Sequence, residues 1–81
     1  MKELHTWQIS CQHTPEMIDR ILMPIRKRGM RLTSLNYQRE TETTALCTVC
    51  FEEEATIADQ VYKNMVRTLD ITSVEKQHSK Q

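Results

Sequence analysis

The stretch Thr14–Gly29, TPEMIDRILMPIRKRG, has the pattern of an amphipathic helix with both ends marked. Its apolar side chains Met17, Ile21 and Ile25 recur at intervals of four, which predicts one buried helical face. Gly29 is the only glycine in the chain and follows three basic residues. Cations favour the last turn of a helix, and glycine favours a left-handed end. The sequence therefore predicts a helix that ends at Gly29.

The first residues of this stretch favour a helix start. Thr14 can cap free backbone N–H groups, Pro15 fits the first helical position, and the acid Glu16 suits the helix dipole. Glu16 can also pair with Arg20 on the exposed face. Pro24 removes one backbone hydrogen bond at a cost of ~3 kcal/mol. We expect a kink there and not a break, because the apolar stripe continues beyond it.

Strands are predicted on both sides of the helix. In His5–Gln12 the side chains of Trp7, Ile9 and Cys11 alternate with polar ones, which indicates a strand with one buried face and one open face. Met30–Arg39 is a second strand, with a shift of parity after Leu32 that predicts a bulge. After a polar turn at residues 40–43, a third strand covers residues 44–51 and should form a hairpin with the second. Its inward residues are Ala45, Cys47, Val49 and Phe51.

A second helix and a short strand complete the chain. The acidic triplet Glu52–Glu54 is interpreted as the solvated entry to this helix, with a cap near Thr56. The apolar residues of the helix recur at intervals of four and are Ile57, Val61 and Met65. The last strand is marked by Leu69, Ile71 and Val74. Residues 77–81 are polar and are expected to form a frayed tail.

The order strand, helix, strand, strand, helix, strand predicts an α+β, ferredoxin-like βαββαβ fold: a four-stranded antiparallel sheet with two helices on one face. We expect a single domain over residues 1–76. In this arrangement the helices lie over the sheet, and the residues expected in contact are Met17, Ile21, Val61, Met65, Ile9 and Val49.

Size and composition favour a protein that associates with a partner. An 81-residue chain buries little core, and short domains gain stability from disulfides, metals or partner subunits. Three cysteines leave one unpaired, and no leader precedes Met1, so we expect reduced thiols and a cytoplasmic location. No apolar run is long enough for a membrane span.

Charge argues against nucleic acid and allows a polarised surface. Acidic and basic side chains balance at 11 each, and only four residues are aromatic, so no nucleic-acid partner is expected. Residues 1–39 carry seven basic and three acidic groups, and residues 40–81 carry four basic and eight acidic ones. Such a division suits electrostatic docking to a partner, although a mixture of solvated faces is the more common outcome.

The sequence offers no group of residues suited to catalysis. Cys47 and Cys50 have the C-x-x-C spacing of metal and redox motifs, but they fall within a predicted strand, where residues three apart point to opposite faces. We expect Cys47 in the core and Cys50 on the open face, as structural thiols. The three histidines are His5, His13 and His78, and they have no ligand spacing. We therefore predict no catalytic residues, no bound metal and no enzymatic activity in this chain.

Three segments together resemble an ACT domain. They are PEMIDRIL at 15–22, RGMRLTSL at 28–35 and LDITSV at 69–74. More narrowly, they resemble the short, isozyme II type of regulatory small subunit of acetohydroxyacid synthase, also called acetolactate synthase. The resemblance covers about residues 7–76, and the longer small subunits of the family have a second domain.

The resemblance implies a regulatory subunit of branched-chain amino acid biosynthesis. Such subunits bind and activate the large catalytic subunit, which holds thiamine diphosphate and magnesium, so no cofactor is expected in this chain. ACT domains often pair through their sheet edges and hold an amino acid between two copies. The positions carried onto this chain are His13, Thr14, Pro15 and Glu16 in the loop after the first strand, and Arg31 and Leu32 at the start of the second.

Two departures from the family pattern affect this site. Amino-acid-binding members have glycine where this chain has Glu16, and often asparagine where it has Arg31. Glycine allows close approach of the backbone to a ligand carboxylate, whereas Glu16 adds bulk and negative charge. We therefore expect weak or no valine binding. The alternative function is a stand-alone homodimeric module that senses a small molecule.

Overall fold

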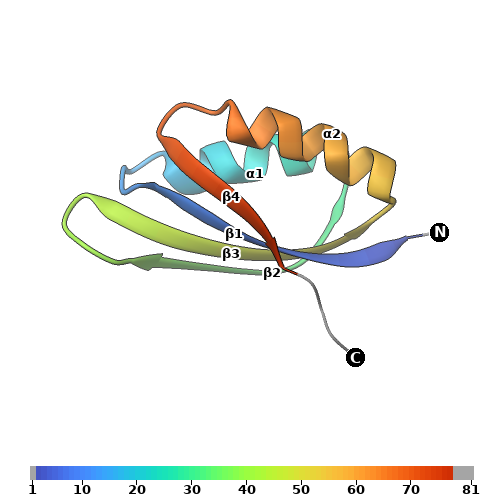
Figure 1. The fold of residues 1–81 in the computed structure, drawn as a ribbon, viewed down its shortest axis with the longest axis horizontal. Helices are drawn as coiled ribbons and strands as arrows, with labels where there is room; N and C mark the ends of the chain where they lie inside the picture. The colour runs from blue at the N-terminus through green and yellow to red at the C-terminus, as the bar shows by residue number, and fades with distance from the viewer. Residues whose placement is uncertain (1, 78–81) are drawn as a thin grey trace.

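The computed structural model describes residues 2–77, and its six elements follow the predicted order. They are β1 (Glu3–Gln12), α1 (Met17–Lys27), β2 (Arg31–Arg39), β3 (Thr44–Glu53), α2 (Ala55–Val66) and β4 (Ile71–Gln77). The strands form one antiparallel sheet in the order β2-β3-β1-β4. Both helices cover the same face of this sheet, so the predicted fold is confirmed (Figure 1). Gln77 is the last residue of β4, and the rest of the predicted tail lies outside the described residues.

The core lies between the sheet and the two helices. The expected contact residues Met17, Ile21, Val61 and Met65 are all buried with Ile9 and Val49 in one cluster. Trp7 belongs to the same cluster, and its ring packs edge-on against Phe51 and Tyr62. The distances between ring centroids are 4.8 Å to Phe51 and 5.6 Å to Tyr62. Such aromatic pairs stabilise a core beyond the area they bury. The predicted inward faces of β1 and β3 are therefore confirmed.

The ends of α1 agree only in part with prediction. The helix begins at Met17, because Thr14–Glu16 form a turn in which the Met17 N–H donates to the Thr14 carbonyl at 3.2 Å. The proposed side-chain cap by Thr14 is wrong, and so is the place of Pro15 in the first helical position. The predicted end is confirmed: Gly29 has φ +64°, and the Met30 N–H donates to the carbonyl of the last helical turn at 3.2 Å.

The interior of α1 is continuous. The helix passes through Pro24 without a break, as predicted, and the expected kink stays a prediction. The side chain of Arg20 acts on the predicted partner Glu16 only through its charge, which helps to lower the pKa of Glu16, while its guanidinium donates to Asp70 Oδ2 at 3.0 Å. Asp70 precedes β4 and has φ +70°, a conformation that aspartate tolerates better than most residues. This ion pair connects α1 to the start of β4.

The acidic triplet is only in part a solvated helix entry, because Glu54 alone of the three is exposed and directly precedes α2. Glu52 and Glu53 are the last residues of β3, and α2 begins directly after Glu54, ahead of the predicted cap near Thr56. Glu53 is only 5% exposed, because the alternation of β3 turns it toward the helices. Its Oε1 atom makes no hydrogen bond with any group among residues 2–77 and lies 3.5 Å from Lys2 Nζ.

Two further predictions concern β2 and β4. The bulge in β2 is confirmed by a register shift between Leu32 and Ser34. Leu69, in contrast, was wrongly assigned to the last strand: it lies in the preceding turn and is 70% exposed. The turn is needed because the backbone reverses at Asp70 before the strand can pair with β1.

The basic and acidic halves of the sequence interleave in the fold. Arg31 in β2 lies opposite Glu52 in β3, and Arg20 pairs with Asp70. A division of charge along the sequence therefore does not become a division between two surfaces. The mixed arrangement, which the sequence analysis left as the more common outcome, is what the structure has.

Candidate functional site

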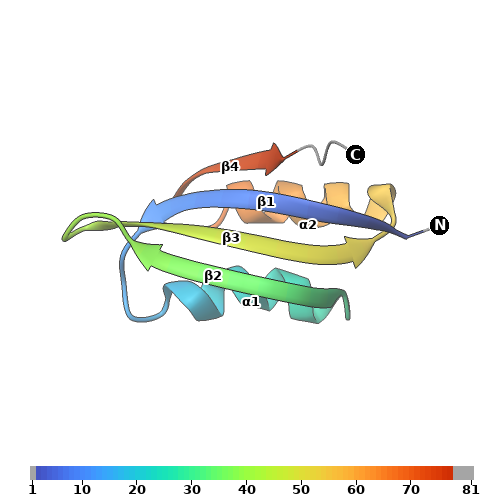
Figure 2. The ribbon, with the colours of Figure 1, turned by 90° about the horizontal axis from the view of Figure 1, so that it is seen from below.

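The six residues of the predicted ligand site lie at two opposite ends of the sheet. β1 and β2 are both antiparallel to β3, so they run in the same direction and α1 returns the chain between them. The loop His13–Glu16 therefore lies at one end, and Arg31 and Leu32 lie at the other (Figure 2). A nine-residue strand spans roughly 30 Å, so the two groups cannot meet on one chain.

At the loop end, His13 is held by backbone and side-chain contacts. Its N–H donates to the Thr43 carbonyl at 2.8 Å, and its Nδ1 atom is hydrogen-bonded to the Tyr37 hydroxyl at 3.0 Å. Burial raises the pKa of Tyr37, and the nearby thiols of Cys11 and Cys47 raise it further. Sequence reasoning missed Tyr37 as part of this site. The sequence signal that could have found it was the position of Tyr37 near the end of the second predicted strand, which runs in the same direction as the first.

Thr14 and Glu16 add polar groups to the same loop. The Glu16 carboxyl is exposed, and its pKa is lowered first by a hydrogen bond from its own backbone N–H and then by the nearby Thr14 hydroxyl. That hydroxyl is buried, and no group among residues 2–77 forms a well-directed hydrogen bond with it. Pro15 is exposed beside them. The loop therefore presents a negative charge at the start of α1.

At the other end, Arg31 and Leu32 have different surroundings. Arg31 is exposed and lies opposite Glu52 of the neighbouring strand. Leu32 is half-buried, lies opposite Phe51 and packs against the core. The next residue, Thr33, lies at the bulge, where its hydroxyl donates to the Cys50 carbonyl at 3.0 Å. Only a second copy of the chain could bring this end of β2 to a loop like His13–Glu16.

The three cysteines have the environments expected of structural thiols. Cys11 and Cys47 are buried, and Cys50 lies half-buried on the opposite face of β3 with its Sγ 3.4 Å from Thr6 Oγ1. Desolvation by burial raises the pKa of Cys47 to about 12. Within residues 2–77, no group of three or more potential His, Cys, Asp or Glu ligands is close enough together to hold a metal ion.

β2 is one of the two edge strands of the sheet, and β4 is the other. β2 pairs only with β3 among the described strands, so one side of its backbone has no strand partner there. Leu35 and Tyr37 on its helix-facing side are only half-buried, although they pack against the core. α1 lies beside this strand and has Ile18 39% exposed (Figure 2). An edge strand with apolar neighbours favours pairing with another strand. Elsewhere, none of the described helices is long and apolar enough to cross a membrane.

Solved structures with this arrangement include an ACT domain and an acetolactate synthase small subunit. The crystal structure of the ACT domain from GTP pyrophosphokinase of Chlorobium tepidum is similar over 95% of this chain and 100% of that chain, with a TM-score of 0.80 and 13% identity. The acetolactate synthase small subunit of Thermotoga maritima is similar over 91% of this chain but only 47% of its own length, with a TM-score of 0.78 and 13% identity.

The C-terminal domain of the MgtC protein of Mycobacterium tuberculosis also matches, with a TM-score of 0.75 and 7% identity over 94% of this chain and 86% of that one. No protein-family model matches the sequence, and no curated protein is similar to it. At these identities the similarity shows the fold alone. The chain therefore has the ferredoxin-like fold of ACT domains.

Proposed function

We propose that this chain is a cytoplasmic, non-catalytic regulatory subunit that binds and activates the catalytic subunit of an acetolactate synthase. Thiamine diphosphate and magnesium belong to that catalytic partner. The proposal rests on the fold, which is shared by the small subunit from Thermotoga maritima, and on the sequence segments that resemble the same family. One observation carries it furthest: the open β2 edge, flanked by half-buried apolar side chains, is a surface suited to association.

Pairing of two β2 edges would complete the predicted ligand site. In an antiparallel pair of β2 strands, the Arg31 end of one copy meets the Arg39 end of the other. The Arg39 end lies beside the loop His13–Glu16, because β1 and β2 run in the same direction. Arg31 and Leu32 of one copy would thus lie near the loop of its neighbour. The dimer would thus bring together the two groups of site residues that lie far apart in a single chain.

The chemistry of this shared site argues against tight amino-acid binding. Glu16 is exposed and its pKa is lowered, so it carries a negative charge at neutral pH beside the start of α1. An amino acid bound with its carboxylate at this helix start would meet that charge. We therefore propose that activation and stabilisation of the catalytic subunit are the main role. Valine feedback is weak or absent.

The test is co-expression with an acetolactate synthase catalytic subunit from the same source. We expect a complex that survives size-exclusion chromatography and a catalytic subunit that is more active with this chain than without it. Leu35→Asp, on the half-buried side of the β2 edge, should weaken the homodimer, whereas Asn36→Asp on the exposed side should have little effect. A catalytic subunit that neither binds this chain nor changes activity would contradict the proposal. Under the alternative, a stand-alone sensor, the homodimer forms and the synthase is unaffected.

Calorimetric titration with valine, leucine and isoleucine tests the effector part separately. We expect no heat of binding at micromolar ligand. Glu16→Gly should raise the affinity if the side chain and charge of Glu16 block the site, and the matched control Asp19→Gly should not. Micromolar binding of any of the three amino acids to the wild-type chain would contradict this part.

A further inference from the structure

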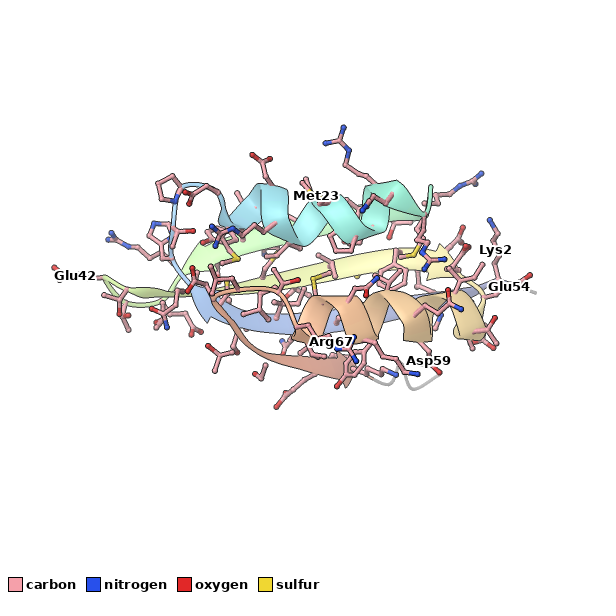
Figure 3. The ribbon with its side chains drawn as sticks, turned by 90° about the horizontal axis from the view of Figure 1, so that it is seen from above. Lys2, Met23, Glu42, Glu54, Asp59 and Arg67 are labelled. Carbon is pink, nitrogen blue, oxygen red and sulfur yellow. The ribbon has the colours of Figure 1, made fainter. Side chains whose placement is uncertain are left out.

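The outer face of α1 carries an exposed apolar side chain between opposite charges. Met23 is 58% exposed on the side of the helix away from the sheet (Figure 3). Asp19, Arg26 and Lys27 line one shallow depression together with it. A methionine adapts its shape to many contacts and is common at binding surfaces. We call these four residues the Met23 face.

A groove beside the Met23 face can accept a side chain. It has a volume of about 330 Å³ and lies between the two helices. Met23, Pro24 and Lys27 line it from α1. Asn64 lines it from α2, and Thr68 lines it from the turn that follows α2. The methionine thus lies at the rim of a depression that it does not fill. A second apolar side chain could enter beside it.

The charges of the Met23 face have no partners within the described part of the chain. The recorded ion pairs among residues 2–77 involve neither Asp19 nor Arg26 nor Lys27. Arg20, which also lines the groove, is different because Asp70 holds its guanidinium at 3.0 Å. Its charge is therefore balanced within the chain. The unbalanced charges are one acid toward the start of α1 and two bases toward its end.

The spacing of these charges makes the face complementary to itself. Asp19 lies four residues before Met23, and Lys27 lies four residues after it. A two-fold axis through Met23 would cross two copies of α1 in opposite directions. Each Asp19 would then face Lys27 of the other copy, and the two Met23 side chains would meet in the centre. An interface of this kind, in which one patch meets itself, is the usual form in two-fold dimers.

We propose that a second copy of this chain docks on the Met23 face, with α1 packed against α1 around a two-fold axis at Met23. Asp19 would contact Lys27 of the other copy, and the two Met23 side chains would pack together on the axis, each beside the groove of its neighbour. Arg26 would lie opposite Arg20 of the other copy, whose charge Asp70 balances. An acidic partner protein would be attracted by Arg26 and Lys27 but repelled by Asp19, whereas a second copy offers Asp19 a base as its partner. This contact lies on the helix layer and uses none of the β2 edge, so the two contacts together would join edge-paired dimers into tetramers.

Charge reversal tests this contact without any other partner. The association constant of the purified chain would be measured by analytical ultracentrifugation for the wild type, Asp19→Lys, Lys27→Asp and the double variant. Each single reversal puts like charges opposite each other at both symmetry-related positions. We therefore expect the association constant to fall about tenfold or more. The double variant restores opposite charges and should recover the wild-type value to within about threefold. Added salt should weaken the wild-type contact, because exposed charges are screened.

A cross-linking experiment gives an independent readout. In a Cys50→Ser background, Met23→Cys should form a disulfide between two copies on mild oxidation, since residues on the two-fold axis approach closely. The matched control is Gln60→Cys, which is exposed on α2 and should form no disulfide between copies under the same conditions. Circular dichroism would establish that each variant is folded.

Three results would overturn the proposal: single reversals that leave association unchanged, a folded double variant that does not recover, or a Met23→Cys chain that cross-links no faster than the control. None of these results depends on the synthase, because no catalytic subunit is present. Failure here therefore leaves the proposed regulatory function standing, and failure of synthase binding leaves this contact standing.

Discussion

At the scale of single residues, burial separates the three cysteines into two kinds. Cys47 and Cys11 lie in the core, and desolvation raises the pKa of both thiols, to about 12 for Cys47. Only the thiolate reacts with alkylating agents, so these two should be protected by low thiolate content as well as by lack of access. Cys50 is half-buried on the open face of the sheet.

We predict that iodoacetamide at about pH 8 modifies Cys50 before the other two thiols. After short exposure, peptide mass spectrometry should find the label at Cys50 and at neither of the other two cysteines. In denaturant all three cysteines should be labelled at similar rates, which provides the control. Early labelling of Cys47 in the folded protein would mean that β3 does not bury it.

Gly29 has a backbone conformation that other residues avoid. Its φ of +64° ends α1, and an added Cβ atom would meet nothing within 4 Å. A change at this position therefore acts through the backbone and not through a clash. Gly29→Ala should reduce the free energy of unfolding by about 1 kcal/mol. Gly29→Asn should cost less, because asparagine tolerates this conformation. Urea denaturation of the three proteins provides the measurement, and equal stability of all three would contradict the reasoning.

At the scale of elements, Pro24 is a local cost that the helix α1 tolerates. Its ring removes one backbone N–H donor from a helix that continues on both sides. The apolar face of α1 is fully buried, and this burial offsets the lost hydrogen bond. Tertiary packing thus holds a helix that local preference alone would interrupt.

Replacement of this proline should stabilise the protein. Pro24→Ala restores the donor to the Arg20 carbonyl, and we expect a gain of about 1–3 kcal/mol in the free energy of unfolding. Thermal denaturation measures the gain, with Gln60→Ala on the exposed face of α2 as the control. An unchanged or lower melting temperature for Pro24→Ala would show that the ring contributes contacts worth more than the hydrogen bond.

At the scale of the whole molecule, stability depends on a single layer of contacts between helices and sheet. Ile21 is fully buried at the centre of this layer, whereas Leu46 is half-buried on the open face of β3. Ile21→Ala should therefore reduce the free energy of unfolding by about 3 kcal/mol, as is usual when a large core side chain is truncated. Leu46→Ala truncates an aliphatic side chain of the same size on the open face, and it should reduce the free energy of unfolding by less than about 1 kcal/mol. Equal losses in urea denaturation would mean that the open face is covered in solution.

Much of the fold could be predicted from local patterns. The strand alternation of Trp7, Ile9 and Cys11 and the helical spacing of Met17, Ile21 and Ile25 are each a direct consequence of backbone geometry. The glycine at the end of α1 and the bulge in β2 were predicted for the same reason. Helix starts were less predictable, because caps at Thr14 and Thr56 compete with turns that neighbouring strands impose.

The candidate site could be predicted only in part. The resemblance supplied its residues, but no sequence pattern shows that His13 bonds Tyr37 or that Arg20 turns to Asp70. These contacts join residues far apart in the chain, and a sequence records only the spacing along it. For the same reason the burial of Glu53 was missed, since it depends on where β3 ends beneath α2.

The order of the elements, most of the inward-facing residues and the position of the left-handed turn depend on side-chain periodicity and local backbone preference, so they can be predicted from the sequence. The tertiary structure alone decided that the loop His13–Glu16 and the start of β2 lie at opposite ends of the sheet, and that Asp19, Met23 and Lys27 share an uncovered face. The direction of the strands separates the loop from the start of β2, and the packing of α1 on the sheet leaves its outer face exposed. Both features depend on how residues far apart in the sequence pack into one core.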